Sequence, residues 1–359
     1  MNTDVVPERS EVVVIGGGVM GAAALHYLVA LGCERPVLLE RDTLASGSTG
    51  RCAGGVRTLF SDDLNRRICD ESIRRFERFE DEIGQKLDLR LWGYLFLLAT
   101  DDDATRFAAD GARMLTPHGA REIIPQLDVD GLAAAAFDER AGYVTPDLVV
   151  QGYARHAAER GAHIEQSCAA TRVVTDGGRV TGVETARGTI ATERVILTAG
   201  VWSSDLFDLP IERERRHMFF TEDAPSFPAE LPLTIDFATG FYFHREGAAL
   251  ALGGREQTLE GLAPIAARRL PSLEELGIRS TWWGYYEMSP DHNALIGAAS
   301  DPEGLFYATG FSGHGFQQGP VVGEHLAQLA LGEEPTFDLS QFAVERFASG
   351  AVREEHNVI

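Results

Sequence analysis

The chain has 359 residues, and its 54 acidic side chains outnumber its 32 lysines and arginines, giving a formal net charge of −22. This excess of negative charge argues against a nucleic acid or an anionic membrane surface as a partner, because phosphate groups would be repelled. No apolar run approaches the roughly 18 residues of a membrane-spanning helix. The length suits one large domain or two to three interleaved ones.

Cysteine and lysine are both used sparingly. The four cysteines, Cys33, Cys52, Cys69 and Cys168, form neither a CxxC pair nor a regular framework. This usage predicts reduced thiols and no metal site and, since no signal peptide is evident, a cytoplasmic protein. Lys86 is the only lysine in the sequence.

The predicted elements begin with a β-α-β unit. Residues 11–15 are a β-branched run typical of a strand buried on both faces, GGGVMG and a helix with apolar spacing follow, and residues 37–40 are a second such strand. Further helices are expected over 62–86, 101–114, 148–161 and 321–332, and strands over 94–100, 193–200 and 305–310. Residues 163–197 and 211–289 are mainly β in pattern.

These elements predict an α/β fold with interleaved domains. Nucleotide-binding signals lie at the amino terminus, in the middle and near the carboxyl terminus of the sequence. We therefore expect a discontinuous Rossmann domain made of residues 1–80, 143–210 and 290–359. A β-rich substrate domain, made of residues 81–142 and 211–289, would interrupt it.

A dinucleotide fingerprint stands between the first strand and the first helix. Gly16, Gly18 and Gly21 form G-x-G-x-x-G, in which the glycines permit the tight turn, the approach of a pyrophosphate and close helix packing. Glu40 ends the second strand, where an acid accepts from ribose hydroxyls and disfavours a 2′-phosphate.

The fingerprint alone leaves NAD and FAD open, and three later segments favour FAD. GSTGRCAGG follows the second strand, ERVILTAGVW joins a strand to a glycine turn, and GFSGHGFQQGP places backbone N–H groups at a helix start. Such a helix start stabilises negative charge on a reduced flavin ring. The residues expected to contact the cofactor are Gly16, Gly18, Val19, Met20, Gly21, Glu40, Arg41, Ser48, Thr49, Arg51, Cys52, Ala53, Gly54, Val173, Ala199, Gly200, Trp202, Gly313, His314, Gly315, Phe316 and Gln317.

Six stretches carry a family resemblance: VVVIGGGVMGAAALHYLVALG, VLLER, GSTGRCAGGVR, VILTAGVW, MSPDHNALIG and YATGFSGHGFQQGP. In these stretches the sequence resembles the D-amino-acid-oxidase-type flavoenzymes. Within that family it is most similar to the sarcosine-oxidase-like and glycine-oxidase-like branch. It is also similar to FAD-dependent oxidoreductase-domain proteins tied to respiratory complex assembly. The resemblance implies a glutathione-reductase-type FAD domain and oxidation of the C–N bond of an amine or amino acid by hydride transfer to flavin N5.

The resemblance also implies a substrate site. Arg57 matches the arginine that binds the substrate carboxylate in monomeric sarcosine oxidases; a structural salt bridge is the alternative. Gln317 stands where those enzymes carry a second, lysine anchor, and this departure favours a different or less anionic substrate or another anchor, with Arg255 and His217 as candidates. Arg51 is expected at the flavin or the pyrophosphate.

Three further side chains are considered for the site. Tyr242 and His244 alternate with phenylalanines on one strand and so share a face, and His314 lies between glycines of the flavin loop. The expected catalytic set is Arg57, Tyr242, His314 and Gln317. Asp291 and His292 resemble an acid–base pair, but the family pattern favours a turn that fixes the chain beside the flavin.

Two positions argue for non-covalent FAD. Gly284 occupies the place of the cysteine that links FAD in the related sarcosine oxidases. Cys52 takes the place of a histidine that links FAD in dimethylglycine-dehydrogenase-like relatives, and a small residue packed under the ring is the simpler interpretation.

The missing lysines bear on the electron acceptor. Ala251 stands where monomeric sarcosine oxidases carry the lysine that promotes reaction with O₂, and Lys86 falls far from these motifs. We therefore expect an FAD-dependent amine or amino-acid oxidoreductase closer to a dehydrogenase than to a fast oxidase, with O₂, a quinone or a partner protein as the acceptor. A flavoprotein subunit or assembly factor and a 2-hydroxy-acid dehydrogenase remain open, whereas an NAD-dependent dehydrogenase would not need GFSGHGF.

Overall fold

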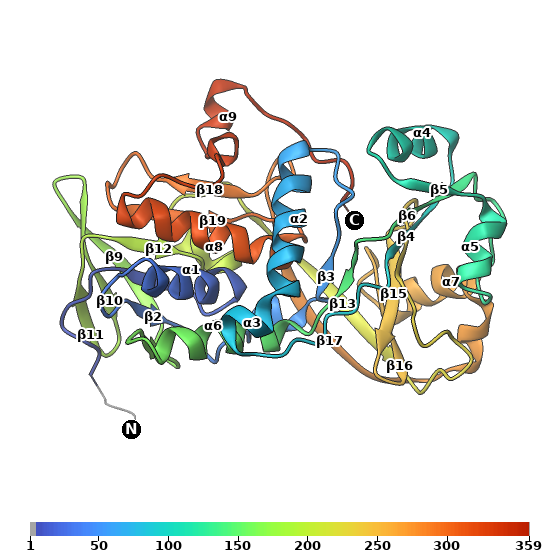
Figure 1. Ribbon diagram of the computed structural model, residues 1–359, viewed down its shortest axis with the longest axis horizontal. Coiled ribbons are helices and arrows are strands. Elements are labelled where there is room, and N and C mark those ends of the chain that lie inside the picture. Colours follow the sequence, from blue (N-terminus) through green and yellow to red (C-terminus); the bar gives the residue numbers. More distant parts are fainter. Residues whose placement is uncertain (1–4, 359) are drawn as a thin grey trace.

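The computed structural model describes residues 5–358, which form two lobes around two large sheets (Figure 1). The first lobe is built on a six-stranded sheet in the order β18-β19-β12-β1-β2-β8, parallel except for β18. Every residue of β1, β2 and β12 is buried, as expected for parallel strands covered on both faces. Its strands are β1 (Val13–Ile15), β2 (Val37–Leu39), β8 (His163–Glu165), β12 (Val195–Leu197), β18 (Leu295–Ala298) and β19 (Leu305–Thr309).

Helices cover one face of this sheet. Helix α1 (Val19–Ala30) packs along α8 (Gly315–Leu331), and α6 (Pro146–Ala158) and α2 (Asp63–Glu77) flank this pair (Figure 1). A Cβ on Gly323 would lie 2.4 Å from the Cβ of Ala23, so the glycine is what allows the two helices to approach this closely. The opposite face carries a three-stranded sheet of β9 (Ala170–Asp176), β10 (Arg179–Thr185) and β11 (Gly188–Ala191).

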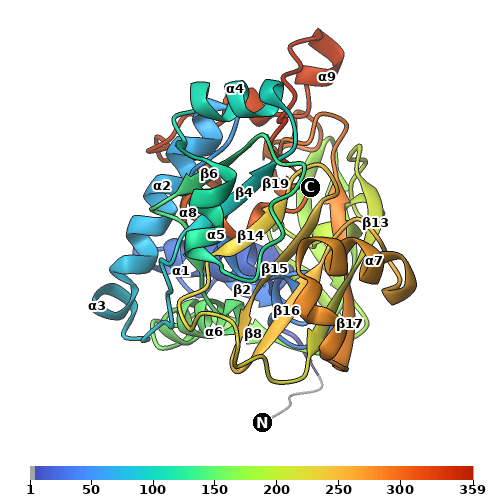
Figure 2. The ribbon, with the colours of Figure 1, turned by 90° about the vertical axis from the view of Figure 1, so that its right-hand side faces the viewer.

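The second lobe is built on an eight-stranded sheet in the order β17-β13-β16-β15-β14-β4-β6-β5. This lobe faces the viewer in Figure 2. Helices α4 (Asp101–Ala109), α5 (Pro117–Ile123) and α7 (Leu259–Arg269) pack around it, and hydrophobic residues form its buried core. The strands are β4 (Tyr94–Leu98), β5 (Arg113–Leu115), β6 (Ala134–Asp138), β13 (Glu212–Thr221), β14 (Leu233–Asp236), β15 (Phe241–Glu246), β16 (Ala249–Gly253) and β17 (Ile278–Met288).

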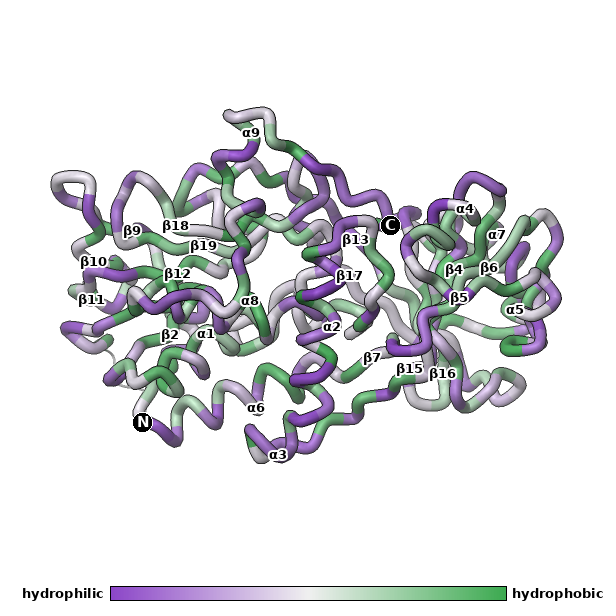
Figure 3. Tube along the Cα trace, turned by 45° about the horizontal axis from the view of Figure 1, so that its top comes forward, coloured by the Kyte–Doolittle hydropathy of each residue, from purple (hydrophilic) through white to green (hydrophobic). Residues whose placement is uncertain are grey.

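Short elements complete the chain. Strands β3 (Gly55–Val56) and β7 (Gly142–Tyr143) pair where the chain passes between the lobes, and the helices α3 (Phe79–Ile83) and α9 (Arg346–Ser349) are single turns. Figure 3 shows the hydrophobic residues concentrated along the central strands and the hydrophilic ones along outer loops. No described helix is long and apolar enough to cross a membrane.

The fold class agrees with the sequence analysis. The expected helix over 62–86 is broken at Arg78, which ends α2, and α3 stops at Gly84 in a left-handed conformation (φ +74°). The expected helix over 101–114 was too long, because residues 113–115 pair with β6 as β5. The segment 211–289 contains α7, which its β-rich pattern did not predict.

The last long helix begins earlier than expected. The sequence predicted a helix over 321–332, but α8 starts at Gly315 and continues through Pro320. A proline inside a helix lacks an N–H donor and clashes with the preceding turn, which is why the pattern suggested a later start. The consequence for the site is large, since the helix start falls within the glycine-rich loop itself.

Two buried histidines join α1 to α6. Nδ1 of His26 lies 2.8 Å from Nδ1 of His156, and both side chains are less than 9% exposed. Burial, together with the charges of His156 and Arg160, lowers the pKa of His26 to about 3. The pair is therefore neutral in the folded protein and shares one N–H proton.

We predict that this pair makes stability fall in acid. The folded pKa of His26 is below its unfolded value of 6.5, so its contribution is complete above pH 6.5 and is lost as pH falls toward 3. If unfolding takes up one proton, the unfolding equilibrium constant rises about tenfold for each unit by which the pH falls. Urea denaturation of the FAD-loaded protein between pH 7 and 4 should give a shallower pH dependence for His26→Leu than for the parent. The exposed control His118→Gln should match the parent; equal slopes for all three proteins would contradict this assignment.

Candidate active site

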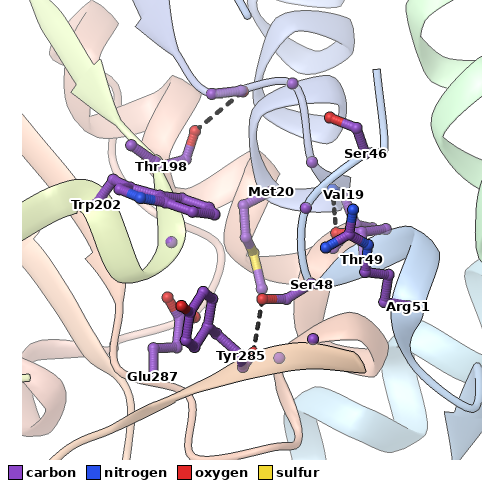
Figure 4. A pocket seen from close by; sticks show the side chains of 18 of the residues that line it. Val19, Met20, Ser46, Ser48, Thr49, Arg51, Thr198, Trp202, Tyr285 and Glu287 are labelled. Atoms are coloured by element: carbon purple, nitrogen blue, oxygen red, sulfur yellow. Dashed lines mark hydrogen bonds between the residues drawn. The ribbon is translucent and has the colours of Figure 1, made fainter. Parts of the chain in front are cut away.

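A cavity of about 510 Å³ opens at the carboxyl ends of the parallel strands and continues to the eight-stranded sheet (Figure 4). Ile15, Leu39 and Thr198 line it at the ends of β1, β2 and β12. Residues of β13, β15 and β17 line it from the second lobe. The carboxyl ends of a parallel sheet are where dinucleotides bind in α/β folds.

The glycine loop after β1 approaches neighbouring backbone too closely for any side chain. Gly16 has φ +109°, and a Cβ there would lie 2.4 Å from the carbonyl oxygen of Thr198. A Cβ on Gly21 would lie 1.9 Å from the carbonyl oxygen of Gly16. The loop is held by a bond from the Gly17 N–H to Oε2 of Glu40 (2.7 Å). The fingerprint glycines thus have the steric roles that the sequence predicted.

Two helices begin at this cavity without a side-chain cap. The first is α1, whose N-cap is Gly18, and the second is α8, whose N-cap is His314. The first-turn N–H groups of a helix lack intrahelical acceptors and carry a partial positive charge. Residues of both first turns line the cavity, so it offers two places for negative charge, as a pyrophosphate and a reduced flavin ring require.

One hydrogen bond across the cavity joins the two lobes, and a second joins the loop over 46–53 to the start of α1. Ser48 Oγ donates to the carbonyl oxygen of Tyr285 on β17 (2.7 Å), and the Val19 N–H donates to Thr49 Oγ1 (3.1 Å), as drawn in Figure 4. The guanidinium carbon of Arg41 lies 4.0 Å from the ring centroid of Trp202. The loop over 46–53 is therefore fixed before any cofactor binds.

Most of the residues expected to contact the cofactor line this cavity. They are Gly16, Gly18, Val19, Met20, Glu40, Arg41, Ser48, Thr49, Arg51, Cys52, Ala53, Ala199, Gly200, Trp202, Gly313, Gly315 and Phe316.

A few of the expected cofactor residues lie elsewhere. Gly21 lies beneath the loop, against Gly16. Val173 does not line the cavity: β9 leaves its edge after Ala170 and Thr171, which line it instead. Gly54, His314 and Gln317 line the adjoining smaller cavity described below.

A half-buried glutamate, Glu287, also lines the larger cavity. Thr309 Oγ1 donates to Oε2 of Glu287 (2.8 Å). Burial raises the pKa of Glu287 to about 7, although the Thr309 bond opposes this. Glu287 lies on β17 beside Trp202 and Tyr285 (Figure 4), and no motif marked it, because its depth depends on how the two lobes meet.

A second cavity of about 80 Å³ adjoins the first and shares Cys52, Tyr242, Tyr286 and Gly313 with it among its lining residues. All four residues of the expected catalytic set line this smaller cavity: Arg57, Tyr242, His314 and Gln317. Tyr94 and Tyr286, which the sequence analysis did not single out, complete an aromatic wall together with Phe96. We call this the small cavity.

The buried Arg57 guanidinium binds carbonyl oxygens and no carboxylate. Its Nη2 donates to the carbonyl of Asn357 (2.6 Å) and its Nη1 to the carbonyl of Leu59. The ring of Phe60 lies 3.8 Å below the guanidinium carbon. Within residues 5–358 no acidic oxygen lies within 4.0 Å of it, so the alternative of a structural salt bridge finds no support. Burial lowers the pKa of Arg57, yet an arginine in a protein stays charged.

Gln317 and His314 lie beside Arg57. Oε1 of Gln317 accepts from the main-chain N–H of Arg57 (2.7 Å), which positions the arginine's backbone. Both ring nitrogens of His314 are buried without a partner among the described residues. Burial and the Arg57 charge lower the pKa of His314 to about 4. The ring is therefore neutral near pH 7 and can hydrogen-bond a ligand as donor or acceptor.

Tyr242 lies between the two cavities, whereas His244 does not reach either. The Tyr242 hydroxyl lies 2.8 Å from Sδ of Met218, and burial raises its pKa well above 10. His244 is two residues further along β15, packs on Tyr143 with ring centroids 4.9 Å apart, and bonds the carbonyl of Arg245. Successive residues on one face are about 7 Å apart, so a shared face did not bring both to the site.

The two alternative anchors also lie away from the cavities. His217 on β13 packs against Phe219, and Arg255 is exposed in the loop after β16. Neither lines a cavity.

The acid–base interpretation of Asp291 and His292 is replaced by a structural one. The carboxylate of Asp291 accepts from Nε and Nη2 of Arg346 (2.8 Å each) and from the Asn293 N–H. His292 has φ +59° and completes the turn. Asp291 therefore fixes the chain between β17 and β18, as the family pattern suggested.

Neither candidate position for a flavin link offers a reactive thiolate. Gly284 lines the larger cavity, where a Cβ would lie 3.1 Å from the Cβ of Arg51. Cys52 donates from Sγ to the carbonyl of Thr49 (3.1 Å), and burial raises its pKa to about 12. Within the described residues, no group of three or more His, Cys, Asp or Glu side chains could hold a metal ion.

The fold, with the larger cavity at the carboxyl ends of its parallel strands, is that of a dinucleotide-binding protein, and the small cavity opens beside that cavity. The family model "DAO: FAD dependent oxidoreductase" matches residues 11–329. The chain therefore belongs to the FAD-dependent oxidoreductase family, which confirms the resemblance in the sequence and the expected cofactor, FAD.

Individual relatives show how far the similarity extends. FAD-dependent oxidoreductase domain-containing protein 1 of Xenopus laevis is 29% identical over 99% of this chain and 86% of its own length. Human mitochondrial sarcosine dehydrogenase is 30% identical over 95% of this chain, but the chain spans only 42% of that protein. The crystal structure of L-proline dehydrogenase from P. horikoshii is 29% identical, with a TM-score of 0.89 over 97% of this chain and all of that one.

We predict that Glu40 discriminates FAD from FMN. Losing one charge-assisted bond to the adenosine ribose should weaken FAD binding about tenfold in Glu40→Gln. FMN has no adenosine, so its affinity should not change. Fluorescence quenching of each flavin titrated with apoprotein gives both constants. Glu34→Gln, an exposed carboxylate on the next loop, serves as the control, and an equal loss for FMN and FAD would show that Glu40 supports only the loop.

Proposed function

We propose that this protein oxidises the C–N bond of a small amino acid, a secondary or N-methyl amino acid in the first instance, and passes the electrons to an acceptor other than O₂. One observation carries the proposal: a buried guanidinium that contacts no carboxylate and a neutral imidazole face a small aromatic cavity that adjoins the larger one. Bound FAD accepts a hydride from the substrate carbon and becomes reduced. The names of the sarcosine and L-proline dehydrogenases support this substrate class.

The side chains of the small cavity divide the work of binding. The Arg57 guanidinium binds the carboxylate through two parallel bonds, and Gln317 holds the arginine's backbone in place. Tyr94, Tyr242 and Tyr286 enclose the rest of the substrate and exclude water. His314 is neutral, so it hydrogen-bonds the amine without taking a full charge. Positioning, rather than a strong protein base, is then the main catalytic contribution.

The charges around the cavities support an acceptor other than O₂. Lys86 is exposed after α3 and lines neither cavity, and Ala251 is buried in β16. Arg216 lines the larger cavity, but Glu214 pairs with it. Arg41, Arg51 and Arg57 also line the cavities, so the argument concerns lysine and not positive charge in general. Among the described residues no lysine ammonium faces the cavities, and a lysine is the group that promotes the reaction with O₂ in the sarcosine oxidases that the sequence resembles.

The enzyme class is favoured over a purely scaffolding role. A flavoprotein that acts only through protein contacts has no need of a cavity lined by a buried arginine that contacts no carboxylate. We propose a cytoplasmic location and non-covalent FAD for the same protein, in line with its cysteine usage.

We predict that a carboxylate-bearing secondary amine bleaches the flavin. Sarcosine, L-proline, L-pipecolate, D- and L-alanine, pyrrolidine and lactate are each mixed anaerobically with the FAD-loaded protein, and absorbance near 450 nm (roughly the flavin band) is followed. At least one amino acid should reduce the flavin at least tenfold faster than the amine that lacks a carboxylate.

The matched variant is Arg57→Lys, with the exposed Arg121→Lys as its control. Loss of the bidentate geometry should raise KM for the amino acid about 10- to 100-fold and leave the slow reaction with pyrrolidine unchanged. Bleaching by lactate alone would favour hydroxy-acid oxidation. No bleaching by any compound would refute the proposed function.

We predict slow reoxidation by O₂. Protein reduced anaerobically by its amine substrate, or by dithionite, is mixed with air-saturated buffer and separately with a soluble quinone. The quinone should reoxidise the flavin rapidly, because its reduction needs no protein-stabilised superoxide. A second-order rate constant for O₂ of about 10⁵ M⁻¹s⁻¹, which is within the ordinary range for enzymes, would instead identify an oxidase.

A further inference from the structure

The small cavity is closed on one side by a segment that comes from far along the chain. After α9 the chain crosses to the amino-terminal end of α2 and ends its described part there (Figure 1). This stretch is strongly hydrophilic (Figure 3). Nevertheless Asn357 and Val358 line the small cavity, and Asn357 is 1% exposed. We call residues 356–358 the cover.

The residue before the cover is a firm anchor. The carboxylate of Glu355 is fully buried and accepts from the N–H groups of Ser61 (2.8 Å) and Asp62 (3.0 Å) and from Asn65 Nδ2 (3.1 Å). Burial would raise the pKa of Glu355, but the N–H groups of Ser61, Asp62 and Asn357 and the charge of Arg57 lower it overall. Its own N–H donates to the carbonyl of Asp291 (3.1 Å). The chain up to Glu355 is thus fixed to α2 and to the turn after β17.

The cover itself has few attachments. The Asn357 carbonyl accepts from Arg57 Nη2 (2.6 Å), Asn357 Nδ2 donates to Asp110 Oδ2 (3.0 Å), and the Asn357 N–H donates to Oε1 of Glu355 (3.0 Å). Oδ1 of Asn357 is buried without a partner among the described residues. His356 is exposed and bonds Ser61 Oγ only through its N–H (2.9 Å). Because only a few hydrogen bonds hold residues 356–358, a bound ligand can replace them while Glu355 stays in place.

The contact with Arg57 is one that an anion would replace. A carbonyl offers a dipole, whereas a carboxylate offers a full negative charge and two oxygens to the guanidinium. The guanidinium is buried with no carboxylate in contact, a costly state for a charge. The Asn357 carbonyl therefore holds a donor that an anionic ligand would bind more strongly.

The cover also lies where a ligand would have to enter. The small cavity shares Cys52, Tyr242, Tyr286 and Phe316 with the larger cavity, which we call the cofactor cavity because we expect it to hold FAD. A cofactor bound there would fill the route past these residues. Asn357 and Val358 belong to the part of the wall that the cofactor cavity does not share.

We propose that residues 356–358 are a displaceable cover on the substrate cavity, in which the main-chain carbonyl of Asn357 occupies on Arg57 the place of the substrate carboxylate. The inference rests on the proposed function, since it takes the small cavity to be the substrate site. Binding and covering are then mutually exclusive, so the cover sets both the access to Arg57 and the chemistry of the group that can displace it: a carboxylate displaces it, and a neutral amide does not.

The test measures competition on the FAD-loaded protein, with acetate as the probe and acetamide as its neutral counterpart. Calorimetry gives the dissociation constant of acetate for the parent, for a chain ending at Glu355 and for Asn357→Ala, which loses only the Asp110 tether. The shortened chain should bind acetate at least tenfold more tightly, and Asn357→Ala about threefold or more. The controls Glu354→Gln and His356→Ala, both exposed in the same segment, should match the parent.

Hydrogen exchange provides the second measurement. Saturating acetate should speed exchange at the amides of Asn357 and Val358 in the parent, and acetamide should not. Any of three results would overturn the proposal that residues 356–358 are displaced by a carboxylate. These are unchanged or weaker acetate binding in both variants, no acetate binding to any of the proteins, and unchanged hydrogen exchange at saturating acetate. The proposed function fails by a different result, the absence of flavin bleaching by every amine, so the two failures are distinguishable.

Discussion

The arrangement of this molecule depends on two helices that begin, without a side-chain cap, at one cavity. The starts of α1 and α8 lie some 300 residues apart in sequence, yet both supply first-turn N–H groups to the same space. A pyrophosphate and a reduced flavin ring are both stabilised by such helix starts, and the packing of α1 along α8 over the parallel sheet brings the two starts together. The glycines at 16, 21 and 323 follow from this constraint, because each permits a backbone approach that a Cβ would prevent.

A second constraint is a buried positive charge in a strongly acidic protein. The chain carries a net charge of −22, yet Arg57 is surrounded by carbonyls and aromatic rings, with its backbone held by Gln317. Such a site favours an anion without holding one of its own. It also explains how Gln317 contributes without a charge: it positions the guanidinium, whereas the lysine expected from sarcosine oxidases would act as a second cation.

The sequence was most informative where chemistry depends on short spacing. The fingerprint glycines, Glu40 and six residues of the following loop were assigned from local pattern, and all but Gly21 of these residues line one of the two cavities; the six are Ser48, Thr49, Arg51, Cys52, Ala53 and Gly54. Gly21 packs behind the loop, against Gly16. Their contact with the cofactor stays a prediction.

Residues whose position depends on tertiary structure were the ones missed. Tyr286 and Glu287 reach the site because β17 crosses between the lobes, and Asn357 because the chain doubles back to α2. His244 had the right alternation but lies beyond the cavity edge, and the start of α8 was hidden by Pro320. Alternation assigns residues to one face of a strand, and helical periodicity assigns a segment to a helix. Neither pattern says which of these residues are close enough to line a cavity.

The central claim is that a cofactor cavity and an arginine-containing substrate cavity operate as one site. The most direct measurement is a crystal structure of the FAD-loaded protein grown with acetate. The account predicts the flavin ring between the start of α8 and Tyr286, and the acetate carboxylate on the Arg57 guanidinium in place of the Asn357 carbonyl. Acetate bound away from Arg57, with the Asn357 carbonyl still on the guanidinium at full acetate occupancy, would contradict it.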